Sequence, residues 1–208
     1  MKKTISLFLA LALALSLAAC GGQTAQSPAP TPTAVPESPA AEAHYPVTIT
    51  SYNENGETYT QTFDQCPERV VSISQANTEL LLALGLRDKI IATAHRFSPV
   101  YEPLAEEYNS IPFIAEKGYP AKEVVLDQEP DMIVGWGSLF AEDALGPVSE
   151  WNDRGVGTYL MNNTVSGLGN RTVEFLYDDI ETLGQIFDVE DAAQAMIDDM
   201  KARIAAIG

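Results

Sequence analysis

Short apolar runs alternate with helical patterns along most of the chain. Runs rich in β-branched residues predict buried strands at 69–73, 89–92, 111–114, 131–134 and 157–161. The segments between them carry helical spacing of apolar positions, at 77–84, 101–108, 121–128, 139–145 and 148–152. Gly85 and Pro130 supply natural ends for the first and third of these helices. Alternation at this spacing predicts an α/β fold, with a parallel sheet and covering helices.

A hairpin pattern precedes this alternation. Residues 47–50 and 58–63 are strand-like segments on either side of the turn sequence at 53–56, which ends in Asn-Gly. An Asn-Gly pair between two such segments is the strongest short-range signal for a β-hairpin. We therefore predict two antiparallel strands before the first buried strand.

Two helices are predicted after the last strand. Residues 172–187 place large apolar side chains on one helical face. A second helix is predicted from 189 to about 207, with Asp188 as its N-cap and Asp191 reaching back in the manner of a capping box. The apolar positions of this second helix form one stripe.

The N-terminus has the organisation of a secretory signal. Lys2 and Lys3 precede an apolar stretch over 5–19, which is shorter than the ~20 residues that span a bilayer. The small residues before Cys20 resemble the bacterial lipobox, where a peptidase cuts and the cysteine is acylated. An ordinary signal peptide followed by a chance cysteine is the alternative. We expect a signal peptide over 1–19 and an extracytoplasmic protein anchored to the cell membrane by lipid at Cys20.

Residues 20–44 have the composition of a disordered tether. Ala, Pro, Ser and Thr dominate this segment, and such a composition buries too little apolar surface to offset the entropy of ordering. A proline-recognising partner is the alternative, but the segment lacks a supporting aromatic or charged pattern. The remainder, 45–208, has the length of one domain.

Charge and cysteine content narrow the function classes. Loss of the two signal lysines makes the formal net charge of −17 two units more negative, and the remaining basic residues are scattered. We therefore expect no nucleic-acid partner, because phosphate binding requires a basic stripe. With Cys20 acylated, Cys66 is the remaining thiol. We interpret Cys66 as a small residue at a strand entrance rather than a reactive or metal-binding thiol.

Ligands of open parallel sheets bind beyond the carboxyl ends of the strands, so the loops there deserve the closest attention. These loops combine aromatic rings, amides and one arginine, which suits a bulky and partly apolar ligand. Arg96 has the geometry to pair with an acidic oxygen group of a ligand. The candidate ligand-binding residues are Gln75, His95, Arg96, Tyr119, Trp136, Ser138 and Asn162.

Three of these residues have equally simple structural interpretations. Trp136 can cap the end of the sheet without touching a ligand. Arg96 can pair with a glutamate on the surface. A lone histidine such as His95 is more often structural than a ligand-binding residue.

Three segments resemble, in order, the signatures of one family. Residues 68–80, followed by 84–91, are similar to the opening of the substrate-binding lipoproteins that serve ABC importers of ferric siderophores, haem and cobalamin. Residues 123–134 resemble the second signature, and 179–207 the third. The resemblance spans about 67–208.

The resemblance implies two α/β lobes joined by a long helix, with the ligand between them. On this pattern 45–188 is the N-terminal lobe and 189–208 is the connecting helix, so we expect a truncated chain without the second lobe. The family also implies that Glu79, on the first helix, docks into an arginine pocket of an ABC permease. The alternative for Glu79 is charge compensation at a helix N-terminus, worth only ~0.3–1 kcal/mol.

A ferric siderophore is the expected ligand, because Arg96, Trp136 and Tyr119 suit an oxygen-rich chelate. Haem, with His95 or Tyr119 as axial donor, and cobalamin are the alternatives. Direct capture of zinc or manganese would need several converging His or carboxylate ligands. The only other histidine, His44, falls in the tether. We therefore expect no metal site and no resident cofactor.

An enzyme is the competing class. A Gly-x-Ser-x-Gly motif is absent, since residues 135–138 have the wrong order. The Gly-x-Gly at 167–169 lacks the third glycine of a dinucleotide fingerprint. We expect a solute-binding protein rather than a hydrolase, with a sensory or scaffolding lipoprotein as the other alternative.

Overall fold

The computed structural model describes residues 43–207, so Cys20 and the predicted signal peptide lie outside the described residues. Within this range, no helix combines the length and apolar character needed to cross a bilayer. The strands are β1 (Val47–Tyr52), β2 (Thr58–Phe63), β3 (Val70–Ile73), β4 (Ile90–Ala94), β5 (Phe113–Ala115), β6 (Met132–Gly135) and β7 (Gly157–Leu160). The helices are α1 (Gln75–Ala83), α2 (Ala105–Asn109), α3 (Lys122–Leu126), α4 (Val148–Asn152), α5 (Val173–Phe187) and α6 (Glu190–Ala205).

Strands β3 to β7 form one parallel sheet, in the order β5-β4-β3-β6-β7. The chain winds from β3 towards β5 and then returns to the other side of β3 to add β6 and β7. The winding direction therefore reverses between β3 and β6, and ligands of such sheets bind beyond the carboxyl ends of the strands at this point. The predicted α/β fold with a parallel sheet and covering helices is confirmed.

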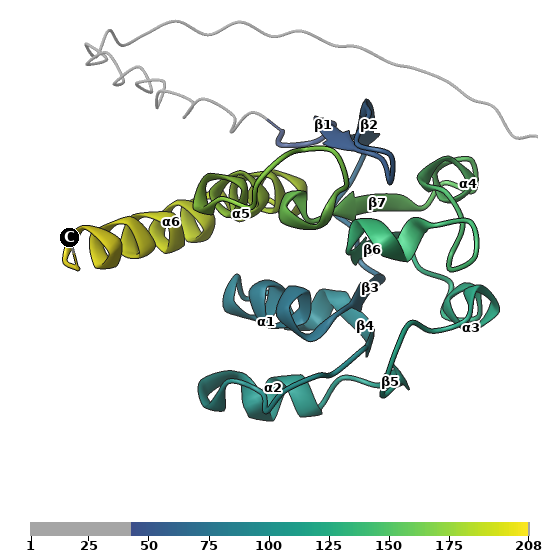
Figure 1. The fold of residues 1–208 in the computed structure, drawn as a ribbon, viewed down its shortest axis with the longest axis horizontal. Helices are drawn as coiled ribbons and strands as arrows, with labels where there is room; N and C mark the ends of the chain where they lie inside the picture. Colours follow the sequence, from purple (N-terminus) through teal and green to yellow (C-terminus); the bar gives the residue numbers. More distant parts are fainter. Residues whose placement is uncertain (1–42, 208) are drawn as a thin grey trace, which may run out of the picture. The chain divides into compact units, whose positions relative to one another are not determined.

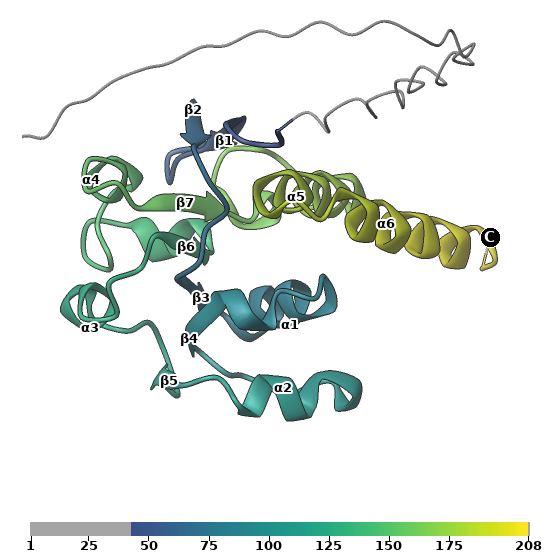
Figure 2. The same ribbon diagram turned by 180° about the vertical axis from the view of Figure 1, so that it is seen from behind.

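Helices cover both faces of the sheet, as Figures 1 and 2 show from opposite sides. One face packs against α1, α2 and α5, which bury Leu81, Tyr108 and Leu183. The other face packs against α3 and α4, which bury Val125 and Trp151. Alternate residues of each strand serve the two faces, and all four residues of β3 are buried. This explains why the strands appear in the sequence as continuous apolar runs.

The predicted hairpin is present as β1 and β2, which pair antiparallel from Val47 opposite Phe63 to Tyr52 opposite Thr58. The Asn53 side chain organises the turn, because its Oδ1 accepts hydrogen bonds from the backbone N–H groups of Asn55 and Glu57, at 3.0 and 2.9 Å. Gly56 has a φ of +80°. A Cβ at this position would lie 2.5 Å from a backbone oxygen of another loop. The turn therefore requires glycine for two independent reasons.

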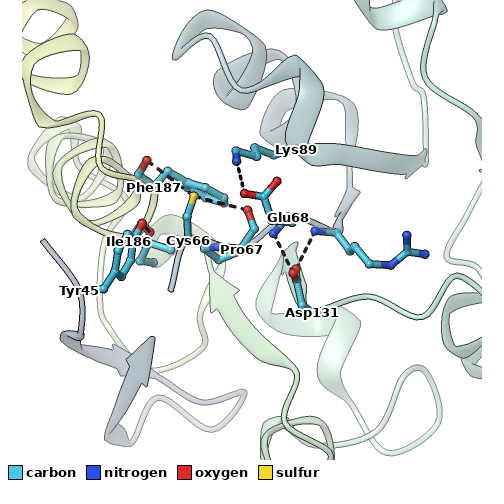
Figure 3. Close-up of polar contacts among 9 residues, drawn as sticks. Tyr45, Cys66, Pro67, Glu68, Lys89, Asp131, Ile186 and Phe187 are labelled. Carbon is cyan, nitrogen blue, oxygen red and sulfur yellow. Dashed lines mark hydrogen bonds and ion pairs between the residues drawn. The ribbon is translucent and has the colours of Figure 1, made fainter. Parts of the chain in front are cut away.

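A polar network joins the strands at the edge of the sheet where they begin, beside a cavity of about 590 Å³ that Asp131 helps to line (Figure 3). The Asp131 carboxylate accepts the backbone N–H of Glu68 at 2.7 Å and that of Arg69 at 2.8 Å. The Arg69 guanidinium donates to the carbonyls of Gln128 and Glu129. These bonds tie the segment entering β3 to the segment entering β6.

The C-terminal carbonyls of α5 face the segments that precede β1 and β3. The Tyr45 hydroxyl donates to the carbonyl of Ile186 at 2.8 Å, and the Cys66 thiol lies 3.9 Å from the carbonyl of Phe187 (Figure 3). The last carbonyls of a helix lack partners within the helix, so these contacts complete its hydrogen bonding. Cys66 is a free, partly buried cysteine in this contact.

The predicted role of Asp188 is wrong. Asp188 is the C-cap of α5 in the left-handed conformation, with a φ of 57°, and its N–H donates to the carbonyl of Gly184. The N-cap of α6 is Val189, which has no side-chain capping bond, so no capping box with Asp191 forms. Aspartate is favoured at N-caps and also tolerates the left-handed region. The sequence therefore marked the boundary correctly but assigned the residue to the wrong helix.

The predicted helix at 139–145 is also wrong. This segment contains only the end of a short 3-10 helix, Gly137–Phe140, before the chain turns into α4. Leu139, Phe140 and Leu145 are nevertheless completely buried against the face of the sheet that α3 and α4 cover. Burial of a loop accounts for the apolar spacing that predicted a helix.

Candidate functional site

Four aromatic rings gather beyond the carboxyl ends of β4, β5 and β6. His95 directly follows β4, Trp136 directly follows β6, and Tyr119 lies in the loop after β5. The ring centroid of His95 lies 5.5 Å from that of Tyr119 and 5.6 Å from that of Trp136. Phe97 adds a fourth ring, 5.8 Å from His95. These separations are those of favourable aromatic pairs, and we call these four residues the aromatic cluster.

A cavity of about 500 Å³ lies beside the aromatic cluster. Its volume is within the usual range for small-molecule sites. Phe97 is 56% exposed, so a large aromatic side chain of the cavity faces solvent. The cavity is lined by His95, Arg96, Phe97, Ser98, Lys117 and Gly118.

His95 occupies a strained backbone position at this edge of the sheet. Its φ is +62°, in the left-handed region that few residues with a side chain adopt. Its N–H donates to the carbonyl of Ala115, and its carbonyl accepts the N–H of Gln75. Its Nδ1 is buried, with no hydrogen-bond partner among residues 43–207. A buried unpaired nitrogen costs about 1–3 kcal/mol, so a ligand atom that paired with it would recover that energy.

Gln75 positions the loop that carries Phe97. Gln75 is 2% exposed, and its Oε1 accepts the N–H groups of Phe97 and Ser98 at 3.2 and 3.0 Å. Its Nε2 donates to Glu79 at 2.8 Å and to the carbonyl of Pro99 at 3.2 Å. An amide side chain has two donor hydrogens and two main acceptor sites. The amide of Gln75 is therefore fully hydrogen-bonded to the loop and to Glu79, and its contact with a ligand stays a prediction.

Arg96 lines the cavity and also forms a surface ion pair. Its Nη2 donates to a carboxylate oxygen of Glu116 at 3.0 Å, and its guanidinium lies 4.9 Å from the ring centroid of Phe113. The pairing with a surface glutamate, which the sequence left as an alternative, is thus present. Exposed pairs contribute at most about 1 kcal/mol. An acidic oxygen of a ligand can therefore replace Glu116 at small cost.

Tyr119 and Ser138 link two of the loops. Their hydroxyl oxygens lie 2.8 Å apart, which joins the loop after β5 to the loop after β6. Trp136 is partly buried, and its ring meets His95 edge to face, with 77° between the planes. Trp136 packs against the core and is also part of the aromatic cluster. Its position at the end of the sheet fits the structural interpretation, and its contact with a ligand stays a prediction.

Asn162 contributes to a buried network beyond the end of β7. Its backbone N–H donates to Asp179 Oδ1 at 3.0 Å, and the Tyr159 hydroxyl donates to the same oxygen at 2.9 Å. The other carboxylate oxygen of Asp179 is buried without a partner among the described residues. Burial raises the pKa of Asp179 to about 7, although the hydrogen bonds from Asn162 and Tyr159 act in the opposite direction.

Three residues at this edge of the sheet are not among the ligand-binding residues predicted from the sequence. Two of them, Phe97 and Lys117, lie in the same loops as His95 and Tyr119, and their place in those loops is the feature of the sequence that indicates them. The signal for Asp179 was an acidic residue on the otherwise apolar face of a predicted helix. Its importance depends on burial, which the pattern did not predict.

Comparisons of the sequence and of the structure identify relatives of this chain. The chain matches the model of the periplasmic binding protein family over residues 70–208. A curated relative, the uncharacterized ABC transporter substrate-binding lipoprotein YvrC of Bacillus subtilis (strain 168), is 26% identical over 159 residues. The match covers 76% of this chain and 45% of YvrC.

Two solved structures are similar over most of the described residues. A periplasmic binding protein from Veillonella parvula DSM 2008 has a TM-score of 0.73 and 31% identity, over 79% of this chain and 52% of that one. An ABC-type Fe3+-hydroxamate transport system from Saccharomonospora viridis DSM 43017 has a TM-score of 0.65 and 26% identity, over 78% and 56%. The chain thus spans about half the length of these relatives. Because the family match includes more than half of the chain, the protein belongs to the periplasmic binding protein family.

Proposed function

We propose that the protein is the solute-binding component of an ABC importer and that its cavity forms one wall of a site for a ferric siderophore. The observation that carries this proposal is the aromatic cluster beside a cavity, at the edge of the sheet where such folds bind ligands. The similar protein from Saccharomonospora viridis, described as part of an Fe3+-hydroxamate transport system, supports the ligand class. The family consists of binding proteins, so the proposal includes no catalytic step.

The chemistry of the wall suits a chelate with an apolar frame and anionic oxygens. The faces of Phe97 and Trp136 offer area for flat, partly apolar ligand surface. Arg96 and Lys117 offer positive charge to the oxygens. The hydroxyls of Tyr119 and Ser138 add donors at a fixed separation. These groups come from three different loops, so they surround a bulky ligand rather than a small ion.

Tryptophan fluorescence tests this proposal. The chain has two tryptophans. Trp136 is partly exposed in the aromatic cluster, whereas Trp151, on α4, is completely buried in the core on the other face of the sheet. The probe is a gallium(III) hydroxamate siderophore, which does not absorb in the visible range. We expect it to change the emission of Trp136, with a dissociation constant in the micromolar range, a binding free energy of about −8 kcal/mol. The Trp136→Phe variant retains Trp151 and should show no change.

Haem is the second candidate ligand, because of His95. Its ring belongs to the aromatic cluster and its Nδ1 has no hydrogen-bond partner among residues 43–207, so a turn of the ring would let a nitrogen coordinate a haem iron. The test is a titration with haem followed by the Soret band. A shifted band that is lost in His95→Ala, with no response to the hydroxamate, would replace the siderophore proposal. A response to cobalamin alone would assign the third ligand that the family resemblance implies.

Glu79 is proposed as the docking residue for the permease. It lies on α1 and is partly exposed, and one carboxylate oxygen accepts from Gln75 at 2.8 Å and from the N–H of Tyr101 at 3.2 Å. The described residues form no salt bridge with Glu79. Its negative charge is therefore free to meet a positive pocket on a partner.

The test is the uptake of iron chelate by cells that carry each variant in a transport-competent full-length protein. It distinguishes a loss of docking to the permease from a loss of folding. Glu79→Lys should abolish uptake, and Glu79→Gln, which keeps the acceptor oxygen, should lower uptake while preserving the loop. The matched control is Glu123→Lys, a charge reversal at an exposed position of α3. Normal uptake with Glu79→Lys would contradict docking. Binding of ligand without any uptake in the unchanged protein would favour a sensory or scaffolding role.

Attachment to the outer face of the cell membrane through Cys20 completes the proposal. Its support is the lipobox resemblance and the description of YvrC as a lipoprotein. Metabolic labelling with a radioactive fatty acid should label the protein, and Cys20→Ser should remove both the label and membrane retention. Labelling that persists in Cys20→Ser would show that the anchor lies elsewhere.

A further inference from the structure

A second polar cluster lies outside the aromatic site, where α5 meets α6. His44 Nδ1 is 3.3 Å from an Asp188 carboxylate oxygen and 3.4 Å from a Glu190 carboxylate oxygen. The three donor atoms lie within 4.8 Å of one another. Asp188 is the left-handed residue that ends α5, and Glu190 is the first residue of α6. Three side chains of the types that ligate metals therefore converge from segments about 140 positions apart in the sequence.

The tautomer of His44 is determined by its second nitrogen. Nε2 lies 2.7 Å from the carbonyl oxygen of Gln185, and a carbonyl can only accept, so Nε2 carries a hydrogen. In the neutral ring, the lone pair of Nδ1 then faces the two carboxylates. The Tyr45 ring packs edge to face with the imidazole, at 4.6 Å between centroids. A histidine held by a carbonyl on one nitrogen and open on the other is the usual arrangement of a metal ligand.

The charges in this cluster favour a cation. Two carboxylates and a nitrogen lone pair repel one another, and a positive charge between them relieves this repulsion. Among the described residues, the salt bridges of Asp188 and Glu190 are with His44 and not with any Lys or Arg. The contacts of 3.3 and 3.4 Å are longer than the usual N–H···O hydrogen bond of about 2.7–3.2 Å.

The same distances fit a zinc ion. Zinc binds imidazole nitrogen and carboxylate oxygen at about 2.0–2.2 Å in a tetrahedron. The edges of such a tetrahedron, which are the distances between neighbouring ligand atoms, are about 3.3–3.6 Å. The two distances from His44 Nδ1 match an edge of this length.

We propose that His44, Asp188 and Glu190 bind one Zn2+ ion, with water completing the coordination. The side chains of Asp188 and Glu190 are 59% and 47% exposed, so the ion has an open path from solvent. The mixture of one imidazole and two carboxylates favours zinc over calcium, which takes oxygen ligands. The bound ion clamps the segment before β1 onto the junction of α5 and α6.

Calorimetric titration of the metal-free full chain with ZnCl2, in detergent, tests the site. We expect one ion per chain, with a dissociation constant in the low micromolar range, and a rise in the thermal unfolding midpoint on binding. His44→Ala should weaken binding at least tenfold. Asp188→Asn and Glu190→Gln, which preserve side-chain shape, should each weaken it by a similar factor and keep the metal-free unfolding midpoint close to that of the unchanged protein.

Two controls separate this site from weak binding to an acidic protein. Asp191→Asn removes a neighbouring carboxylate of α6 outside the cluster, and Cys66→Ser removes the thiol; both should bind zinc as the unchanged protein does. Co2+ should give the visible absorption bands of tetrahedral coordination, and these should disappear in Glu190→Gln. Zinc binding that survives in all three cluster variants would overturn the proposal. So would the absence of one-to-one binding in the unchanged protein.

Discussion

The two edges of the parallel sheet differ in how completely their polar groups are paired. At the edge where the strands begin, Asp131 accepts two backbone N–H groups, and Arg69 donates to two carbonyls. At the edge where the strands end, Ser74 and His95 have positive φ angles of 107° and 62°. The Oγ of Ser74 and the Nδ1 of His95 are buried without partners among residues 43–207.

This difference separates residues that stabilise the fold from residues available to a ligand. Unpaired buried polar atoms and strained backbone are costly, and they persist where the surrounding structure holds them in place. An unpaired buried polar atom also lies beyond the end of β7, because one carboxylate oxygen of Asp179 is buried without a partner among the described residues. The edge where the strands end thus combines unpaired buried polar atoms with exposed aromatic rings, whereas positive φ angles occur at both edges, with Glu129 at 51° before β6. Substitutions at the two edges should therefore have opposite consequences for stability and binding.

Asp179 should produce the largest effect, through pH. Its pKa is about 7 in the folded protein because of burial, whereas an unfolded aspartate has a pKa of about 3.9. Between these values the folded state binds the proton and the unfolded state does not. The free energy of unfolding should therefore fall as the pH rises from about 4 to about 7, by about 3–4 kcal/mol in total, and change little above. Asp179→Asn should lack this component in urea unfolding at pH 5 and pH 8.

The neighbouring residue supplies the control. Asp178 is exposed on the same helix, so Asp178→Asn removes one charge without entering the buried network. Its stability should keep the pH dependence of the unchanged protein with a slightly smaller amplitude, because the charge of Asp178 contributes to the raised pKa of Asp179. Equal pH dependence in Asp179→Asn and the unchanged protein would show that Asp179 is ionised in the folded state across this range.

Asp131 should produce the next largest effect, on stability alone. Asp131→Ala removes two hydrogen bonds to a charged acceptor and should lower the free energy of unfolding by about 2–3 kcal/mol. Asp131→Asn keeps one acceptor oxygen and should lose about half as much. Urea unfolding measures both values. Ligand affinity, measured by Trp136 fluorescence, should not change, since this carboxylate lies at the opposite edge of the sheet. A loss of affinity in Asp131→Ala would contradict the separation of stability and binding between the two edges.

The sequence predicted the elements that bury apolar side chains on a regular period. Strand β3 appears as a β-branched run because both of its faces are buried. The wrong helix at 139–145 has the same origin, since a buried loop also needs apolar residues. Asp188 shows a second limit: a short acidic residue fits both a helix start and a left-handed helix end, and only the backbone path distinguishes them.

For the candidate site, the sequence predicted which loops lie together. It did not predict which polar side chains in those loops keep hydrogen-bonding atoms available to a ligand. His95, Tyr119 and Trp136 come together because parallel strands end at one edge. The amide of Gln75 is occupied because the loop after His95 folds back over α1, which no local pattern specifies. His44 falls in a tether by composition, yet in the structure it contacts α5 through the carbonyl of Gln185.

Phe97 should affect binding much more than stability. Its ring is 56% exposed, so Phe97→Ala should change the free energy of unfolding by no more than about 0.5 kcal/mol. Loss of a stacking face should weaken siderophore binding five- to tenfold, about 1–1.4 kcal/mol. Tyr101→Ala is the matched control, since Tyr101 is 62% exposed but does not line the cavity. Equal losses of affinity in both variants would show that the site extends beyond the loop that carries Phe97.

Glu116 should produce the smallest effect, with opposite signs for the two properties. Its pair with Arg96 is exposed, so Glu116→Gln should cost less than about 0.5 kcal/mol of stability. The substitution frees the Arg96 guanidinium and removes a negative charge near the cavity, so affinity for an anionic chelate should rise about twofold at low salt and fall back as salt increases. Glu123→Gln removes the same charge from α3 and should leave affinity unchanged. A gain of equal size in both variants would mean that net charge, rather than release of Arg96, controls the affinity at this edge.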